Sequence, residues 1–351
     1  RGVNFEREMI GTGPFKLGSW DRSSGAVLPR HDQYWRSGQP YLDKIQLFYN
    51  LDAAASIAAF AARKNDVVKV ADKAQFEAIK ATNPDVRGDT FTGQISDPLI
   101  MKVDRPPFND VRVRRAMHLG LDRQEMINTL TFGLGSMDPP GANAARKGGW
   151  VMSQDELKKL PGFNPATKQQ DIAEAKRLLA EGGHPNGLSA TFMFNSGVTR
   201  RRGEAEMIAA QLAKIGIQLK LDPKETGVAT KAEQDGDYAM TFGQHDWAPE
   251  PDWSNWLHSK GTLAKSGIND PELDRLIDDQ YRELDEPKRK QLWLSIQKLL
   301  LDKLYTIPTI ASVYFIGYQP YVHGWGDIRA GQAVNMTWEK TWMEAGKAPQ
   351  R

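Results

Sequence analysis

Cysteine is absent from this sequence of 351 residues. Its absence excludes structural disulfides, metal or iron–sulfur sites built on thiolates, and catalysis by a cysteine nucleophile. It leaves the cellular compartment open, because cysteine-free chains occur in the cytosol and in the periplasm. A function that depends on thiol chemistry is therefore ruled out at the start.

An excess of charge of one sign is also missing. The chain has 46 Lys and Arg against 44 Asp and Glu, which leaves a formal net charge of +2. General nucleic-acid binding needs a basic surplus, so we do not expect it. No run of about 18 apolar residues occurs, which predicts no transmembrane helix. The length and the ordinary apolar content favour two or three globular domains.

Local motifs for metals and nucleotides are missing as well. The six histidines include no pair spaced four residues apart and no His-Glu-x-x-His, so we expect no metal site and no cofactor. The glycines within residues 11–18 fit neither a dinucleotide-binding loop nor a P-loop. They indicate a structural turn that leads into a strand.

The first part of the chain alternates between strand and helix patterns. Residues 44–49 alternate apolar and polar side chains, as in a half-buried strand. Helices over residues 53–64 and 73–81 then enclose a strand over residues 66–70. This succession indicates an α/β arrangement.

The clearest unit lies between residues 171 and 222. A helix over 171–181 ends at two glycines, and a strand over 189–194 follows. The next helix covers 203–215 and ends at Gly216, before a strand over 217–221. A strand–helix–strand unit of this kind pairs its strands in parallel through a right-handed crossover.

The most unusual loop follows an expected strand over residues 238–243. Carboxylates and indoles are gathered in it: Asp246, Trp247, Glu250, Asp252 and Trp253. Indoles supply a large rigid surface with one donor, which suits a ligand pocket. Two carboxylates across a sugar would suit a glycoside hydrolase, with Asp246 paired to Glu250 or Asp252. Solvated carboxylates and ordinary packing are the structural alternative.

Two arginine clusters invite a functional interpretation. They are Arg112, Arg114 and Arg115 on one helix, and Arg200 to Arg202 shortly before another. We expect both to form locally salt-bridged surface, with the first cluster pointing outward or binding carboxylates.

On the helix that begins near Asp285, we expect Trp293 to belong to the core.

Nine segments carry a resemblance to a known family. In chain order they are Gly11–Leu17, Tyr34-Trp35, Pro40–Ile45, Pro106–Ala116, Asp122-Arg123, Leu178–Gly183, Gln211–Ile217, Asn269–Asp274 and Ile307-Pro308. Together they resemble the oligopeptide- and nickel-type solute-binding proteins of ABC transporters, known as family 5. The segments follow the family's order and span nearly the whole chain.

This resemblance implies an α/β, two-lobed fold like that of periplasmic binding proteins, with a ligand cleft between the lobes. Lobe one would comprise residues 1–105 and a return at 316–351, and lobe two would comprise residues 106–315. In the family, the first of the nine segments lies well into the chain. The resemblance therefore implies that lobe one is incomplete here and that an N-terminal part is missing.

The resemblance also implies a function without chemistry on the ligand. The protein would be the extracellular binding component of an ABC importer, and not an enzyme. It would capture a peptide, an oligosaccharide or a similar small solute and deliver it to the membrane permease. It would act as a periplasmic or extracellular monomer, free or lipid-anchored, although this chain begins at Arg1 without a signal peptide.

The expected binding residues include one departure from the family's pattern. Peptide binders often place an Asp for the ligand's α-amine where this chain has Trp247, with Asp246 one residue earlier. An indole there favours a sugar face or another apolar-faced ligand, or a cation–π contact. We expect these residues to line the cleft: Gln244, His245, Asp246, Trp247, Trp253, Asn195 and Ser196. A glycoside hydrolase and a receptor that signals ligand occupancy remain alternatives.

Overall fold

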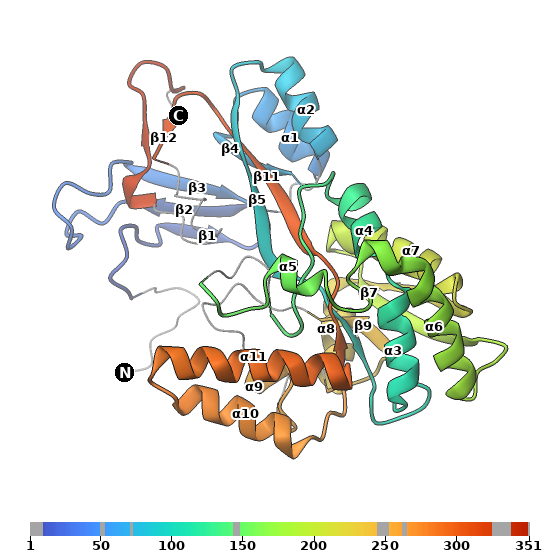
Figure 1. Cartoon of the computed structure of the whole chain (residues 1–351). Coiled ribbons are helices and arrows are strands. Elements are labelled where there is room, and N and C mark those ends of the chain that lie inside the picture. The colour runs from blue at the N-terminus through green and yellow to red at the C-terminus, as the bar shows by residue number, and fades with distance from the viewer. Residues whose placement is uncertain are drawn as a thin grey trace. The chain divides into compact units, whose positions relative to one another are not determined.

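The computed structural model describes residues 10–49, 53–70, 73–142, 148–243, 253–261, 265–324 and 338–349. The chain divides into two compact units. Unit 1 consists of Arg1–Phe91 and Tyr314–Arg351, and unit 2 of Thr92–Val313. Both mix helices with strands, which confirms the predicted α/β class (Figure 1). The lobe boundaries expected near residues 105 and 315 stay a prediction.

The described part of unit 1 contains three small sheets, two α-helices and a short 3-10 helix at Trp338–Lys340. Its elements are β1 (Ser19–Asp21), β2 (Gly25–Pro29), β3 (Lys44–Phe48), α1 (Ala53–Ala61), β4 (Val67–Val70), α2 (Lys73–Thr82), β5 (Arg87–Ser96), β11 (Ala311–Tyr318), β12 (Val322–His323) and β13 (Trp342–Met343). The strands are ordered β1-β2-β3, β4-β11-β5 and β12-β13. Both β5 and β11 extend past the boundary between the units.

The β1–β2 hairpin follows from its turn residues. The Asp21 carboxylate accepts hydrogen bonds from the backbone N–H groups of Ser23 and Ser24, each at 2.8 Å. Gly25 has a φ of +148°, and a Cβ there would lie 1.9 Å from the Leu47 carbonyl oxygen. Because only glycine tolerates that approach, the close pairing of β2 with β3 begins at this residue.

The core of unit 1 forms where α1 and α2 pack beside β4 and β11. Phe60, Val68 and Phe76 are buried. The Phe76 ring stacks on Phe315 with 5.9 Å between centroids. Burying these apolar side chains is what holds the helices on the sheet.

Unit 2 is larger and contains most of the helices. Its elements are β6 (Leu99–Met101), α3 (Val111–Gly120), α4 (Arg123–Leu130), α5 (Gln154–Leu157), α6 (Lys168–Glu181), β7 (Leu188–Asn195), α7 (Thr199–Ala213), β8 (Ile217–Lys224), α8 (Thr226–Asp235), β9 (Met240–Phe242), α9 (Trp253–Trp256), α10 (Pro271–Arg282), α11 (Glu286–Lys303) and β10 (Thr306–Ile307). The five strands are ordered β10-β6-β9-β7-β8.

The strand–helix–strand unit predicted from the sequence is confirmed. β7 and β8 pair in parallel, with Leu188 opposite Ile217 and Asn195 opposite Lys224. The connecting helix α7 buries Ile208 and Leu212 against the sheet. β9 lies on the other side of β7 and is also parallel to it. The carboxyl ends of three neighbouring strands therefore meet at one edge.

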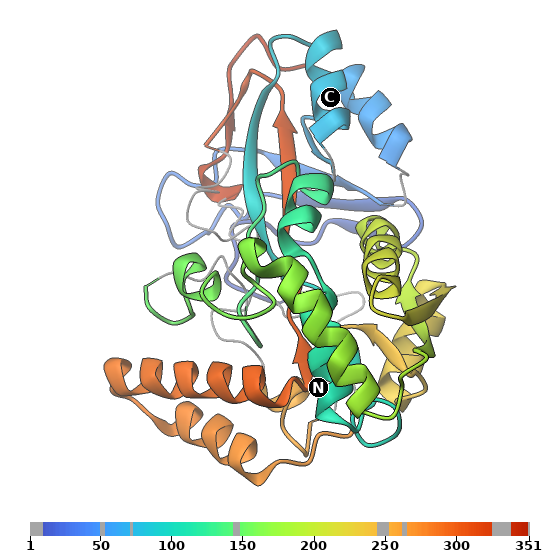
Figure 2. The ribbon, with the colours of Figure 1, turned by 45° about the vertical axis from the view of Figure 1, so that its right-hand side comes forward.

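The helices α10 and α11 form a pair in the part of unit 2 drawn in orange (Figure 2). Asp270 caps α10 by accepting from the Glu272 N–H at 2.9 Å, and Asp285 caps α11 by accepting from the Lys288 N–H at 3.0 Å. Trp293 is fully buried, as expected, and its indole N–H donates to Gln280 at 2.9 Å. The helix start predicted near Asp285 is thus confirmed.

The first arginine cluster departs from expectation at one position. Arg112 pairs with Asp110, and Arg115 is half-exposed near Asp302, as a salt-bridged surface would be. Arg114 instead is buried and donates to the carbonyls of Phe108 at 2.7 Å and Lys303 at 2.6 Å. The expectation that it points outward is wrong, because its planar fork joins the end of α11 to α3.

No helix in the described ranges is both long enough and apolar enough to cross a membrane.

Replacing Arg114 tests whether its side chain links the end of α11 to α3. Arg114→Leu leaves several buried carbonyls without a donor, so we expect the free energy of unfolding to fall by about 3 kcal/mol. The neighbouring Arg115→Leu removes an exposed pair and should cost less than about 1 kcal/mol. Urea denaturation followed by circular dichroism measures both values. Equal losses in the two variants would contradict the anchoring role of Arg114.

Candidate functional site

The carboxyl edge of the parallel strands in unit 2 is the candidate binding edge. From β7 the chain steps to β8 on one side, and from β8 it steps back past β7 to β9. Right-handed crossovers in opposite directions place α7 and α8 on opposite faces of the sheet. Ligands of α/β proteins bind at such a point, where neighbouring loops separate.

Asn195 and Ser196 lie at this edge, as the sequence predicts. The Asn195 Oδ1 accepts from the Gly197 N–H at 2.8 Å and from the Thr226 hydroxyl at 3.0 Å. The Ser196 hydroxyl donates to the Lys224 carbonyl at 2.9 Å. These bonds tie the end of β7 to the end of β8. Within the described ranges the Asn195 Nδ2 donates to no residue, which leaves it available to a ligand.

The other predicted binding residues follow β9 in the sequence. Gln244, His245, Asp246 and Trp247 lie outside the described residues, as do Glu250 and Asp252 of the alternative hydrolase site. Trp253 begins α9, and its side chain is outside the description. The structure therefore brings together Asn195 and Ser196 and leaves the remaining residues as predictions.

A buried charge network, which the sequence analysis missed, lies beneath the same edge. Asp97 is 2% exposed and Arg201 is 4% exposed. The Arg201 guanidinium donates to the Asp97 carboxylate at 2.8 and 3.1 Å, and Arg200 pairs with the same carboxylate. The expectation of a salt-bridged surface holds for Arg202, which is exposed near Glu206, and is wrong for Arg201.

Two further carboxyl groups belong to the network. Burial raises the pKa of Glu204 to about 8, and the negative charge of Asp97 adds to this while Arg200 and Arg201 oppose it. Burial also raises the pKa of Glu233, which lies near Arg201 and accepts from the Thr241 hydroxyl at 3.4 Å. Adjacent arginines at 200 and 201 were visible in the sequence, but their partner Asp97 is 103 residues away from the first of them.

The described residues contain no group of His, Asp and Glu side chains that could hold a metal ion. At the described part of the carboxyl edge, Asn195 provides an amide and Ser196 a hydroxyl.

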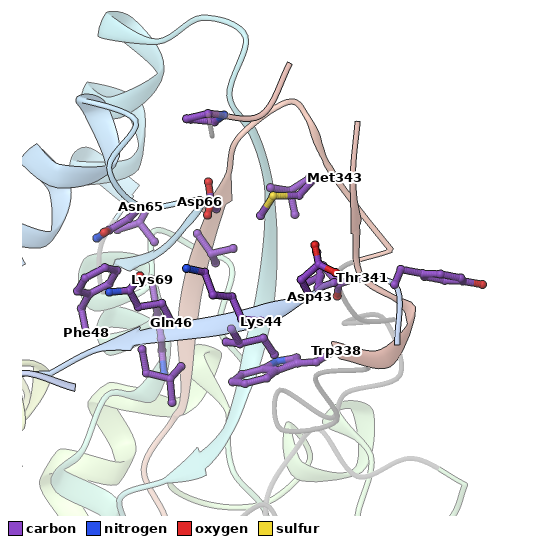
Figure 3. Close-up of a pocket in the computed structure, with 18 of the residues that line it drawn as sticks. Asp43, Lys44, Gln46, Phe48, Asn65, Asp66, Lys69, Trp338, Thr341 and Met343 are labelled. Atoms are coloured by element: carbon purple, nitrogen blue, oxygen red, sulfur yellow. The ribbon is translucent and has the colours of Figure 1, made fainter. Parts of the chain in front are cut away.

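A separate cavity of about 820 Å³ lies within unit 1. It is lined by β3, β4 and the C-terminal segment, with Trp338, Thr341 and Met343 on one side (Figure 3). Lys44 and Lys69 come from the two strands that border it. The lining mixes apolar, polar and charged side chains.

Two edge strands border this cavity. Among the described strands, β3 pairs with β2 alone, and β4 is likewise at an edge of its sheet. Asp43 accepts from the Arg30 N–H and the Tyr49 N–H donates to Ser24. Because strand residues alternate in direction, Ile45 and Leu47 face β2, whereas the N–H groups of Lys44, Gln46 and Phe48 face the cavity. An edge of this kind is suited to pairing with another extended segment.

Comparison with known proteins shows the family to which this chain belongs. The model of the bacterial extracellular solute-binding proteins, family 5 (middle part), matches residues 2–265, about three quarters of the chain. The chain belongs to this family, and the resemblance inferred from its segments is confirmed.

Two relatives each match about nine tenths of this chain. The chain is 26% identical over 335 residues to di/tripeptide-binding protein 1 of Pseudomonas aeruginosa, covering 91% of this chain and 59% of that protein. It is 25% identical over 327 residues to heme-binding protein A of Haemophilus influenzae, covering 90% and 57%. The chain thus spans less than two thirds of the length of these relatives.

A solved structure shares the fold. It is the periplasmic binding protein DppA of Helicobacter pylori in complex with the peptide STSA, with a TM-score of 0.80 and 21% identity. The match covers 96% of this chain and 64% of that one. The expected periplasmic-binding-protein fold is thereby confirmed.

Amide hydrogen exchange can test whether the N–H groups of β3 point alternately toward β2 and away from it. Lys44, Gln46 and Phe48 should exchange about tenfold faster or more than Ile45 and Leu47, because only the latter donate to β2. Two-dimensional NMR in deuterated buffer measures each rate. Ala26 and Val27 of the central strand β2 serve as protected references. Equal rates along β3 would contradict an open edge.

The raised pKa of Glu204 has a consequence for stability. An acid whose folded pKa exceeds its unfolded value stabilises the fold fully below the unfolded pKa, here 4.5, and loses that contribution as the pH rises through about 8. Glu204→Gln keeps the neutral shape and removes this dependence. The melting temperature of Glu204→Gln relative to that of the wild type should rise from about pH 5 to about pH 8 and level off above it. Glu206→Gln, at an exposed position, should show no such trend.

Proposed function

We propose that this chain acts in the capture of a small solute for an ABC importer. The observation that carries the proposal is membership of the extracellular solute-binding family over residues 2–265. The solute is held without chemical change and passed to a membrane permease. The protein works outside the cytoplasm as a monomer, without nucleic acid.

The carboxyl edge of β7, β8 and β9 supplies the part of the site that unit 2 contributes. Asn195 offers its amide N–H₂, and Ser196 is an exposed hydroxyl beside it. The following residues join them from the loop after β9 and from the start of α9: Gln244, His245, Asp246, Trp247 and Trp253. The indoles provide an apolar surface, and the polar groups fix the orientation of the solute.

A short peptide is the best-supported class of solute. Relatives are named for the binding of dipeptides and tripeptides, and the similar solved structure holds a peptide. An oligosaccharide remains the second candidate, because Trp247 stands where a carboxylate for the α-amine was expected and an indole stacks well on a sugar face. The relative named for heme shows that ligands within the family differ widely.

The glycoside hydrolase alternative receives no support. The relatives reported above are named as binding proteins, and the family is defined as one of solute-binding proteins. Asp246, Glu250 and Asp252 are also within seven residues of one another in the sequence. Two catalytic carboxylates must instead face each other across the glycosidic bond, with about 5 Å or more between them.

Calorimetric titration tests the function and the role of Asn195 together. The screen contains trialanine, dialanine and a chitotriose, each titrated into the purified chain and into a version with the length of the relatives. Binding of trialanine or dialanine supports the peptide class, and binding of chitotriose alone supports the sugar class. If neither version binds any of the three, the proposal loses its basis.

Asn195→Asp sharpens this test. The substitution keeps the Oδ1 that holds Gly197 and Thr226 but replaces the free donor with an acceptor. Loss of one good hydrogen bond to a ligand should weaken the affinity about tenfold, or about 1.4 kcal/mol. The control is Asn164→Asp, at another turn where the Oδ1 accepts from a backbone N–H. Unchanged affinity in Asn195→Asp would remove Asn195 from the site.

A further inference from the structure

The end of β9 is held by two bonds from different segments. The Gly243 N–H donates to the Pro98 carbonyl at 2.7 Å, and the Gly243 carbonyl accepts from the Arg201 guanidinium at 3.2 Å. Gly243 is the last described residue before the loop that carries most of the expected binding residues. These two bonds therefore fix the position of Gly243 at the carboxyl end of β9.

We propose that Arg201 is the positioning residue of the binding edge, and that Glu204 controls its hold on Asp97 and Gly243 through a bound proton. The proposal rests on the proposed function, since it concerns the edge at which the solute binds. It assigns no contact between Arg201 and the solute.

The geometry of Arg201 supports a positioning role. The side chain reaches from α7 to the segment before β6, where it binds Asp97, and to the end of β9, where it binds Gly243. Its guanidinium lies 5.5 Å from the centre of the Phe242 ring. A planar fork can hold two acceptors at once in fixed directions, which a lysine ammonium on a flexible stem cannot do. Because Arg201 is buried, water does not readily replace these bonds.

The charges of the neighbouring side chains explain how Glu204 affects the bonds between Asp97 and the two arginines. The single carboxylate of Asp97 binds both Arg200 and Arg201. Glu204 lies one helical turn from Arg200, with 3.8 Å between its Oε1 and the Arg200 Nε. While Glu204 carries a proton, Asp97 is the stronger acceptor for both arginines. Once Glu204 loses the proton, a second carboxylate competes for them and weakens the bonds to Asp97.

The groups that face Glu204 come from several segments. Asp97 precedes β6, Asp138 follows α4, and Arg200 and Arg201 belong to α7 itself. Glu233 of α8 lies near Arg201 and Asp97 on the other side of the network. The two acids near Glu204 keep its proton bound, and the two arginines favour its release. The pKa of about 8 reflects burial together with this balance.

The first experiment follows the Gly243 amide by NMR from pH 6 to pH 9.5, in the chain without added solute. In the wild type the Gly243 amide shift should titrate with a midpoint near 8. In Glu204→Gln the titration should vanish, and in Glu206→Gln, which alters an exposed acid two residues on, it should remain. A flat profile in the wild type, or an unchanged profile in Glu204→Gln, would overturn the proposal.

The second experiment separates positioning from mere stability. Arg201→Lys keeps the charge but loses the fork, so the affinity for trialanine should fall about tenfold, equal to about 1.4 kcal/mol. Arg202→Lys, at the neighbouring exposed position, should leave it unchanged. As the pH rises through 8, the affinity for trialanine should decrease more steeply in the wild type than in Glu204→Gln, because loss of the proton from the α-amine of trialanine near pH 8 affects both proteins equally. A pH profile identical in both proteins would contradict the role of Glu204.

The two experiments distinguish the proposal from the function on which it rests. If neither trialanine nor dialanine binds any version of the protein, the peptide class fails, and the Gly243 titration still decides whether Glu204 controls the end of β9. If trialanine binds and Arg201→Lys retains the wild-type affinity, the positioning role of Arg201 is wrong and the function stands.

Discussion

The parallel pairing of β7 with β8 and β9 is the constraint on which the candidate site depends. It aligns the strands from Leu188 opposite Ile217 to Asn195 opposite Lys224, so that their carboxyl ends meet at one edge. A shift of the register by one residue would turn Phe192 and Phe194 out of the core. Because both are fully buried, the register is fixed by packing. The positions of Asn195 and Ser196 follow from it.

Buried arginines are a second structural feature of unit 2, and their hydrogen-bond donors are satisfied in two different ways. Arg114 and Arg123 donate to backbone carbonyls such as those of Phe108 and Pro308, and so join segments distant in sequence. Arg201 shares the carboxylate of Asp97 with Arg200 and adds one carbonyl. A carbonyl has no proton to lose, whereas a network that includes Glu204 responds to pH. The same residue type therefore anchors the fold in one place and can adjust a binding edge in another.

The elements that were predicted are those with strong local signals. The capping residue Asp285 marked a helix start, and the apolar periodicity of residues 203–215 marked α7, which begins a few residues earlier at Thr199. The strand β5 has no clear local signal, because glycines at 88 and 93 weaken the strand pattern. The helix α8 has none either, because it buries only Ala229 and so has almost no apolar face. Both are stabilised by their neighbours in the fold.

By itself the sequence determined the α/β class, the family, the order of the main helices and strands, and the position of Asn195 and Ser196 at the end of β7. These depend on spacing within short segments, where propensity and periodicity act. Only the tertiary structure decided that Arg114 and Arg201 are buried and that Asp97 is the partner of Arg200 and Arg201. It alone also placed β3 and β4 at the edges that border one cavity. Burial and pairing across a hundred residues arise from packing, and a local pattern of charges does not encode them.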